Sequence, residues 1–267
     1  GWLFGSVRAI LTALGIVGGI KSIARVTSKL VPFMALLYVS TALVVIGANA
    51  AELPGALVTI VRQAFSPEGV TGGMFAVLIL GFRRAAFSNE AGIGSAAIAH
   101  SAVRTKEPLT QGFVAMLEPF IDTVVICTIT ALVITLTVYD PALLNDGVIS
   151  GVELTSSAFA SVIPWFPYVL AVVVILFAYS TMIAWSYYGL EGFIYIFGPK
   201  RWANVTFNSI FCLFVIIGCT MELDTVLDFS DAMIFAMALA NVLGLYLLVP
   251  VVKRDLDVYW ARKRSNP

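Results

Sequence analysis

The segment from residue 72 to residue 103 reads GGMFAVLILGFRRAAFSNEAGIGSAAIAHSAV. Both ends are apolar enough to form helix within a membrane, but the middle carries Arg83, Arg84 and Glu90. Each charge at the centre of a bilayer costs about 2.5–3.5 kcal/mol, so three unpaired charges would cost on the order of 10 kcal/mol. We therefore expect these side chains to be paired or to face a wet cavity.

The same segment predicts a broken helix. Gly92 and Gly94 each lower helix propensity by about 1 kcal/mol relative to alanine. We expect two half-helices with an unwound joint between Arg83 and Gly94, near the middle of the membrane. Such a joint offers N–H groups that attract a carboxylate and carbonyl groups that coordinate a cation. The alternative is a continuous helix whose charges are neutralised by its neighbours.

The composition indicates an all-α membrane protein. Of the 267 residues, 60% are hydrophobic and only 12% are charged, and the mean hydropathy is +0.95. Soluble domains carry about 25% charged residues. The net charge is +0, so the chain has no excess of basic residues that would indicate nucleic-acid binding. His100 is the single histidine, so a metal site built from several histidines is excluded. The motifs of intramembrane proteases are missing from the sequence, so we expect no enzyme and no cofactor.

About seven transmembrane helices are predicted, one of them broken. The apolar runs are Trp2–Ile20, Val31–Ala50, Gly72–Val103, Gln111–Val138, Pro167–Tyr188, Asn204–Thr220 and Ser230–Val252. Of the 16 Lys and Arg residues, twelve fall in one set of alternate loops and two in the other. The basic side faces the cytoplasm. Residues 1–252 would form the transmembrane core of a multi-pass protein of the cytoplasmic membrane, and residues 253–267 a cytoplasmic tail.

Other polar residues within the apolar runs are candidates for binding or packing. Ser180 and Thr181 could coordinate a hard cation through oxygen, or bond back to a preceding carbonyl group. Asp122 is expected to pair with Arg83 or Arg84, with proton or cation coordination as the alternative. Glu118 lies on the same helix face as Asp122 and is a further candidate. His100 could relay a proton or serve as a polar residue at the membrane interface. Small polar residues on one helix face are expected to pack against a neighbouring helix; they are Thr123, Cys127 and Thr130.

Several strings resemble one family of transporters. FSNEAGIGS (Phe87–Ser95) and the following AHS are similar to a segment of the alanine or glycine:cation symporters, also called sodium:alanine symporters. QGFVAMLEPFIDTVVICTITALVI (Gln111–Ile134) resembles another segment of that family, and Gly18–Val26 and Leu30–Val39 fit the stretches that precede them. Ala97 and Glu118 depart from the family pattern.

The resemblance implies a leucine-transporter-like bundle of two inverted repeats, with unwound first and sixth core helices. The seven runs would match core helices four to ten, so we expect a longer protein whose N-terminal half completes the site. By the same resemblance, Ser180 and Thr181 are sodium ligands. The substrate-binding candidates are Phe87, Asn89, Gly92, Gly94, Ser95, Thr181 and Trp185, and the charge network comprises Arg83, Arg84, Glu90 and Asp122.

The resemblance implies sodium-coupled symport of alanine, glycine or similar small amino acids by alternating access, with the lipid bilayer as the surrounding medium. Two alternatives stay open. The first is a proton-coupled transporter of small amino acids that uses Glu90, Glu118, Asp122 or His100. The second is a structural membrane subunit without transport activity of its own.

Overall fold

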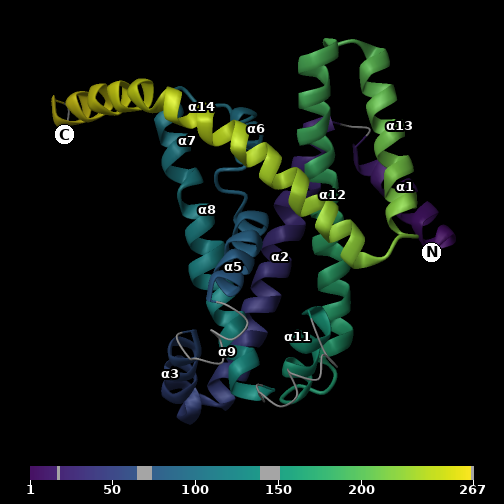
Figure 1. Ribbon diagram of the computed structural model, residues 1–267, viewed down its shortest axis with the longest axis vertical. Helices are drawn as coiled ribbons and strands as arrows, with labels where there is room; N and C mark the ends of the chain where they lie inside the picture. Colours follow the sequence, from purple (N-terminus) through teal and green to yellow (C-terminus); the bar gives the residue numbers. More distant parts are fainter. Residues whose placement is uncertain (17–18, 65–73, 139–150, 266–267) are drawn as a thin grey trace. The chain divides into compact units, whose positions relative to one another are not determined.

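The computed structural model describes residues 1–16, 19–64, 74–138 and 151–265. Every regular element in this part of the chain is helical (Figure 1). The elements are α1 (Trp2–Ile16), α2 (Gly19–Ala48), η1 (Ala50–Glu52), α3 (Leu53–Ala64), α5 (Met74–Asn89), α6 (Ser95–Ser101), α7 (Pro108–Ala115), α8 (Leu117–Pro119), the π-helix η2 (Phe120–Cys127), α9 (Thr128–Thr137), α11 (Gly151–Ala160), α12 (Phe166–Phe197), α13 (Arg201–Gly218) and α14 (Leu223–Ser265).

Within the described ranges, five helical stretches are long and apolar enough to cross a membrane. They are Ser22–Ala48, Pro108–Thr137, Phe166–Phe197, Arg201–Gly218 and Leu223–Arg264. A sixth apolar helix, α1, has only 15 residues, and α5 and α6 are two separate short helices. These stretches agree with the expected all-α membrane protein. The count of seven spans and the leucine-transporter-like fold stay predictions.

The chain divides into two compact units. Unit 1 comprises residues 1–77 and 125–220, and unit 2 comprises residues 78–124 and 221–267. Unit 1 therefore holds α1, α2, α3, α9, α11, α12 and α13, whereas unit 2 holds most of α5 and all of α6, α7, α8 and α14. The joint between the half-helices belongs to unit 2, and the Ser180–Thr181 pair belongs to unit 1.

The main core of unit 1 lies where α2, α9, α11 and α12 meet. Phe159 is fully buried, and its ring centroid lies 4.7 Å from that of Phe166 and 5.5 Å from that of Tyr38. The hydroxyl groups of Tyr38 and Thr130 lie 2.6 Å apart and join α2 to α9. Lipid tails are as apolar as these side chains, so close packing and interhelical hydrogen bonds, rather than exclusion from water, stabilise this core.

Small residues allow the helices of unit 1 to approach closely. A Cβ atom on Gly15 of α1 would lie 2.6 Å from the hydroxyl oxygen of Tyr179 of α12. That hydroxyl donates to the carbonyl oxygen of Leu11 at 3.1 Å. Likewise, a Cβ atom on Gly189 would lie 2.6 Å from the ring of Phe207 on α13. Glycine at these two contacts is typical of helix interfaces in membranes.

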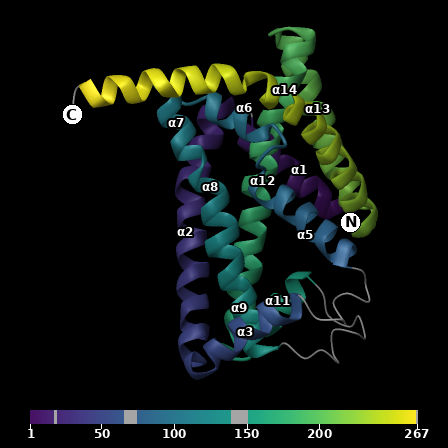
Figure 2. The same ribbon diagram turned by 60° about the vertical axis from the view of Figure 1, so that its left-hand side comes forward.

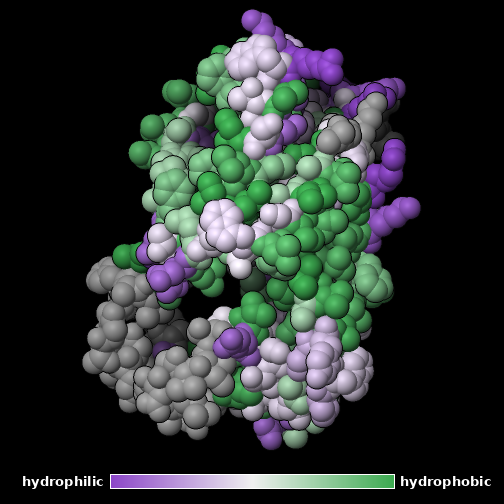
Figure 3. All heavy atoms as spheres, turned by 90° about the vertical axis from the view of Figure 1, so that its right-hand side faces the viewer, coloured by the Kyte–Doolittle hydropathy of each residue, from purple (hydrophilic) through white to green (hydrophobic). Residues whose placement is uncertain are grey.

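Large apolar side chains are exposed on the outer surface of unit 1. On α13, Phe214 is 64% exposed and Val205 is 59% exposed. Apolar residues cover much of the face that Figure 3 shows, and hydrophilic groups gather toward its ends. An apolar exterior of this extent would aggregate in water but matches the hydrocarbon of a bilayer.

The seventh predicted run is longer in the structure than in the sequence analysis. Helix α14 continues to Ser265 and passes residue 252, where the tail was predicted to begin, without a break. Its 43 residues correspond to about 64 Å, roughly twice the thickness of a hydrocarbon core. The predicted start of the third run, Gly72, lies outside the described residues.

Replacing Phe159 with alanine is expected to destabilise unit 1 by about 3–5 kcal/mol, because the fully buried ring would leave a cavity between two aromatic neighbours. Thermal unfolding of the purified protein in detergent measures this loss. The matched control is Phe33→Ala on α2, where the ring is 60% exposed and the expected change is small. Equal losses in the two variants would contradict the assignment of this core.

Candidate functional site

The helix of the third run is broken over five residues. Helix α5 ends at Asn89 and α6 begins at Ser95 (Figure 1). Between them, the backbone has φ of 56° at Glu90, 83° at Gly92 and 104° at Gly94. Residues 90–94, here called the joint, therefore leave the right-handed helical ladder. The predicted break is confirmed, but it is narrower than expected, since residues 83–89 remain helical.

Asn89 is the last residue of α5, and its side chain links α5 to η2. Its Oδ1 atom accepts from the N–H of Ala91 at 2.9 Å. Its Nδ2 atom donates to Oγ1 of Thr123 at 2.9 Å. The amide thus satisfies one backbone group of the joint and fixes the joint against a neighbouring helix. Thr123, which the sequence analysis assigned to a packing stripe, contributes directly to this site.

A second hydrogen bond crosses the joint. The hydroxyl group of Ser95 donates to Oε2 of Glu90 at 2.6 Å. Ser95 is fully buried, and Ile93 within the joint is only 2% exposed. Glu90 and Ser95, which the sequence analysis placed in the charge network and the substrate site respectively, are thereby brought together.

Asn241 of α14 makes a hydrogen bond to the joint. It was not among the predicted site residues. Its Nδ2 atom donates to the carbonyl oxygen of Gly92 at 2.9 Å. A Cβ atom on Gly94 would lie 3.3 Å from Cγ and Oδ1 of Asn241. A lone asparagine in the apolar string ALANVLGLYLL was the signal that could have found it, because such amides bond across membrane helices.

The two arginines of α5 pair with α14 and not with η2. Nε of Arg83 donates to Oδ2 of Asp231 at 3.0 Å, and its Nη2 atom bonds the same oxygen. Nη2 of Arg84 lies 3.4 Å from that oxygen, and Asp228 lies 3.5 Å from Arg83. Asp231 is 4% exposed, so one buried carboxylate contacts both arginines, and Asp228 adds a second negative charge beside Arg83.

The prediction that Asp122 pairs with Arg83 or Arg84 is therefore wrong. Oδ2 of Asp122 accepts from the hydroxyl group of Ser88 at 2.5 Å. Asp122 lies in η2 and faces α5, but its partner Ser88 is four residues beyond Arg84 along α5.

His100 is bonded on both sides of its ring. Its Nε2 atom lies 3.3 Å from Oε2 of Glu118, and its Nδ1 atom lies 2.6 Å from Nε2 of Gln111. These bonds join α6 to α7 and α8. Both ring nitrogens of His100 thus have partners, as a polar residue between helices requires. Glu118 contacts His100, whereas Asp122 contacts a different residue.

The remaining predicted residues lie on α12 in unit 1. Ser180 is 5% exposed, and its hydroxyl group donates to the carbonyl oxygen of Phe177 at 2.9 Å, which is the back-bond considered as the alternative. The ring of Trp185 lies 5.8 Å from that of Tyr188. Thr181 lies on the same helix. Because Phe87 and the joint belong to unit 2, a combined site with these residues stays a prediction.

Comparison with known proteins identifies the family. The profile described as the sodium:alanine symporter family matches residues 1–267. The chain belongs to the sodium:alanine symporter family. Its relatives include the sodium/alanine symporter AgcS of Methanococcus maripaludis, which is 39% identical over 258 residues, covering 96% of this chain and 56% of AgcS. The amino-acid carrier protein AlsT of Bacillus subtilis is 36% identical over 262 residues, covering 97% of this chain and 55% of AlsT.

A third relative, the probable sodium/glutamine symporter GlnT of Bacillus subtilis, is 33% identical over 253 residues, covering 94% of this chain and 52% of GlnT. The chain thus spans about half the length of the curated relatives it matches. The resemblance stated from Phe87–Ser95 is confirmed. The family and these relatives are transporters and not enzymes, and the apolar helices agree with a multi-pass membrane protein.

Replacing Asp231 with asparagine is expected to lower the thermal midpoint of this symporter-family protein by about 5 °C or more. The change removes the buried carboxylate that both arginines contact, and breaking a buried ion pair is strongly destabilising. The control is Asp228→Asn, because that carboxylate is 80% exposed and exposed pairs contribute little. Thermal unfolding followed by circular dichroism distinguishes the two variants.

Replacing Gly94 with alanine is expected to destabilise the protein by about 1–3 kcal/mol. An L-residue is strained at φ of 104°, and the new methyl group would press on Asn241. The control Gly81→Ala lies in α5 with open space around its Cβ position, where alanine should be neutral or slightly stabilising. Thermal unfolding in detergent checks both; a neutral Gly94→Ala would contradict the joint geometry.

Proposed function

We propose that the protein acts in sodium-coupled symport of alanine, glycine or a similarly small amino acid across the cytoplasmic membrane. Membership of the sodium:alanine symporter family supports this function. The observation that supports it is the joint, where an apolar helix is interrupted. The ends of the two half-helices meet there and carry the partial charges of the helix dipoles. Half-helix ends of this kind bind charged solutes in transporters, because the N-terminal end is partly positive and the C-terminal end partly negative.

The substrate carboxylate would meet N–H groups around Gly92, Gly94 and Ser95, and Asn89 would hold the joint in the required shape. Phe87, which is 38% exposed, would contribute an apolar wall beside the joint. The carboxylates near the joint already accept hydrogen bonds or pair with arginine. Backbone groups are therefore the binding groups that we assign to the substrate.

Sodium would bind the oxygen atoms of Ser180 and Thr181. Sodium is a hard cation that prefers oxygen ligands. The hydroxyl proton of Ser180 points to the carbonyl oxygen of Phe177, which leaves lone pairs of the hydroxyl oxygen for an ion. Alternating access would move the bundle that contains the joint against the rest of the transporter. We place the C-terminus in the cytoplasm, from the distribution of Lys and Arg.

Proton coupling is the second candidate, because His100 and Glu118 lie in contact beside the second half-helix. Under this alternative, Asp122 and the His100–Glu118 pair would carry the coupling, and the hydroxyl groups of α12 would serve only in packing.

Uptake of labelled alanine into proteoliposomes is expected to need an inward sodium gradient at equal pH on both sides. Ser180→Ala should raise the sodium concentration for half-maximal uptake about tenfold, because it removes one ligand oxygen. The matched control is Ser186→Ala, which lies on the same helix, is equally buried and bonds back to Ile183 at 2.7 Å.

Two outcomes would contradict the sodium assignment. Uptake that ignores sodium, follows a pH gradient and is abolished by Asp122→Asn would establish proton coupling. Equal effects of Ser180→Ala and Ser186→Ala would remove Ser180 from the ion site. A chain that folds in vesicles but does not bind labelled alanine even when joined to its N-terminal half would support the structural-subunit alternative.

A further inference from the structure

The end of α14 changes direction after Pro250. Proline removes a helical hydrogen bond and bends the helix, and α14 carries Pro250 in its interior. Figures 1 and 2 both show α14 bending so that its last turns run across the end of α7. We call residues 251–264 the terminal segment. This segment and α7 belong to the same unit.

Three side-chain contacts hold the terminal segment across α7. Nη1 of Arg262 donates to Oε1 of Glu107 at 2.6 Å, directly before α7 begins. The ring of Phe113 on α7 lies 5.8 Å from that of Tyr259 and 6.5 Å from that of Trp260. Because α7 is the first part of the candidate span Pro108–Thr137, we expect a helix that crosses its end to run along the membrane surface.

The terminal segment has an apolar face that α7 covers only in part. Val252, Leu256 and Trp260 follow one another at intervals of four residues, so they share a face. Val252 is 55% exposed and Trp260 is 41% exposed. The ammonium group of Lys263 lies 5.8 Å from the centre of the Trp260 ring. An exposed aromatic beside a lysine is typical of residues at the boundary between headgroups and acyl chains.

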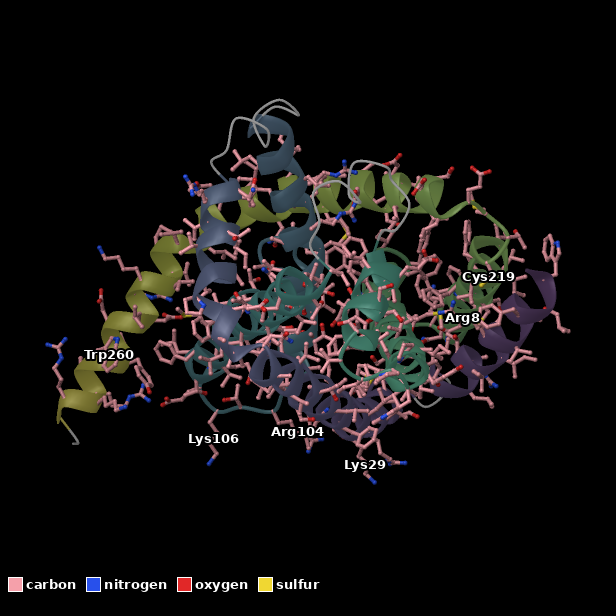
Figure 4. All side chains as sticks on the ribbon, turned by 90° about the horizontal axis from the view of Figure 1, so that it is seen from below. Arg8, Lys29, Arg104, Lys106, Cys219 and Trp260 are labelled. Atoms are coloured by element: carbon pink, nitrogen blue, oxygen red, sulfur yellow. The ribbon has the colours of Figure 1, made fainter. Side chains whose placement is uncertain are left out.

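The charge of the terminal segment is strongly unbalanced. It carries five basic residues against the two acidic residues Asp255 and Asp257. The basic residues are Lys253, Arg254, Arg262, Lys263 and Arg264, all of them exposed. Arg104 and Lys106, in the loop before α7, also point away from the ribbon (Figure 4). A positive surface of this kind attracts anionic headgroups by roughly 1 kcal/mol per residue.

We propose that the terminal segment of α14 is an interfacial helix that binds the headgroups of anionic phospholipids. Its apolar face enters the headgroup boundary, and its basic side chains contact lipid phosphates on either side. The tail predicted from the sequence is then part of the membrane-bound protein and does not extend freely into solution. This inference does not depend on the transported solute.

Quenching of tryptophan fluorescence by brominated lipids tests the proposal on the whole protein in vesicles. One vesicle type contains 20% brominated phosphatidylglycerol in phosphatidylcholine, and the other contains the same fraction of brominated phosphatidylcholine. The quenching difference between the wild type and Trp260→Phe isolates Trp260. At low salt, we expect brominated phosphatidylglycerol to quench Trp260 at least twofold more strongly than brominated phosphatidylcholine does. In 0.5 M NaCl, we expect the ratio of the two quenching effects to fall to about one.

Lys263→Gln/Arg264→Gln should lower the preference for phosphatidylglycerol and leave the Arg262–Glu107 pair intact. The matched control, Lys200→Gln/Arg201→Gln, removes two basic residues at the start of α13 and should leave Trp260 quenching unchanged. Equal quenching by both lipids would overturn the assignment to anionic headgroups. Absence of quenching by either lipid would overturn the interfacial position and indicate a segment that faces water or a protein partner.

Discussion

A backbone that leaves the helical ladder inside a membrane needs new partners for its carbonyl and N–H groups, since lipid supplies none. In unit 2, two asparagine side chains meet this need at the joint. Asn89 accepts from the N–H of Ala91, and Asn241 donates to the carbonyl oxygen of Gly92. The positive φ at Gly94 and the closeness of Asn241 both favour a residue without a side chain there. Without these bonds, the N–H of Ala91 and the carbonyl group of Gly92 would lose these hydrogen-bond partners at the break.

Helix α14 supports the broken helix through two kinds of interaction. Asp231 pairs with Arg83 and Arg84 in the first half-helix, and Asn241 bonds the joint itself. Both arginines thereby hold α5 against α14. The joint that follows them in the chain is the part to which we assign binding.

Much of this arrangement could be predicted from the sequence because its physical cause is local. Apolar runs as long as a bilayer is thick are expected to span it, and a pair of glycines beside charges in an apolar run favours an interrupted helix. The contact of Asp122 with Ser88 could not be predicted, because a sequence pattern does not record how far two helices are shifted along each other. The roles of Asp231 and Asn241 were missed because each lies more than a hundred residues from its partner.

By itself, the sequence determined that this protein is helical, lies in a membrane, contains one interrupted helix and resembles the sodium:alanine symporters. Those properties follow from hydropathy, helix propensity and local motifs, which act over a few turns of one helix. Only the tertiary structure decided which carboxylate balances the arginines, which amide bonds the joint, and how the end of α14 lies across α7. Each of these depends on how two distant helices are rotated and packed, and no periodic pattern within either helix records that rotation.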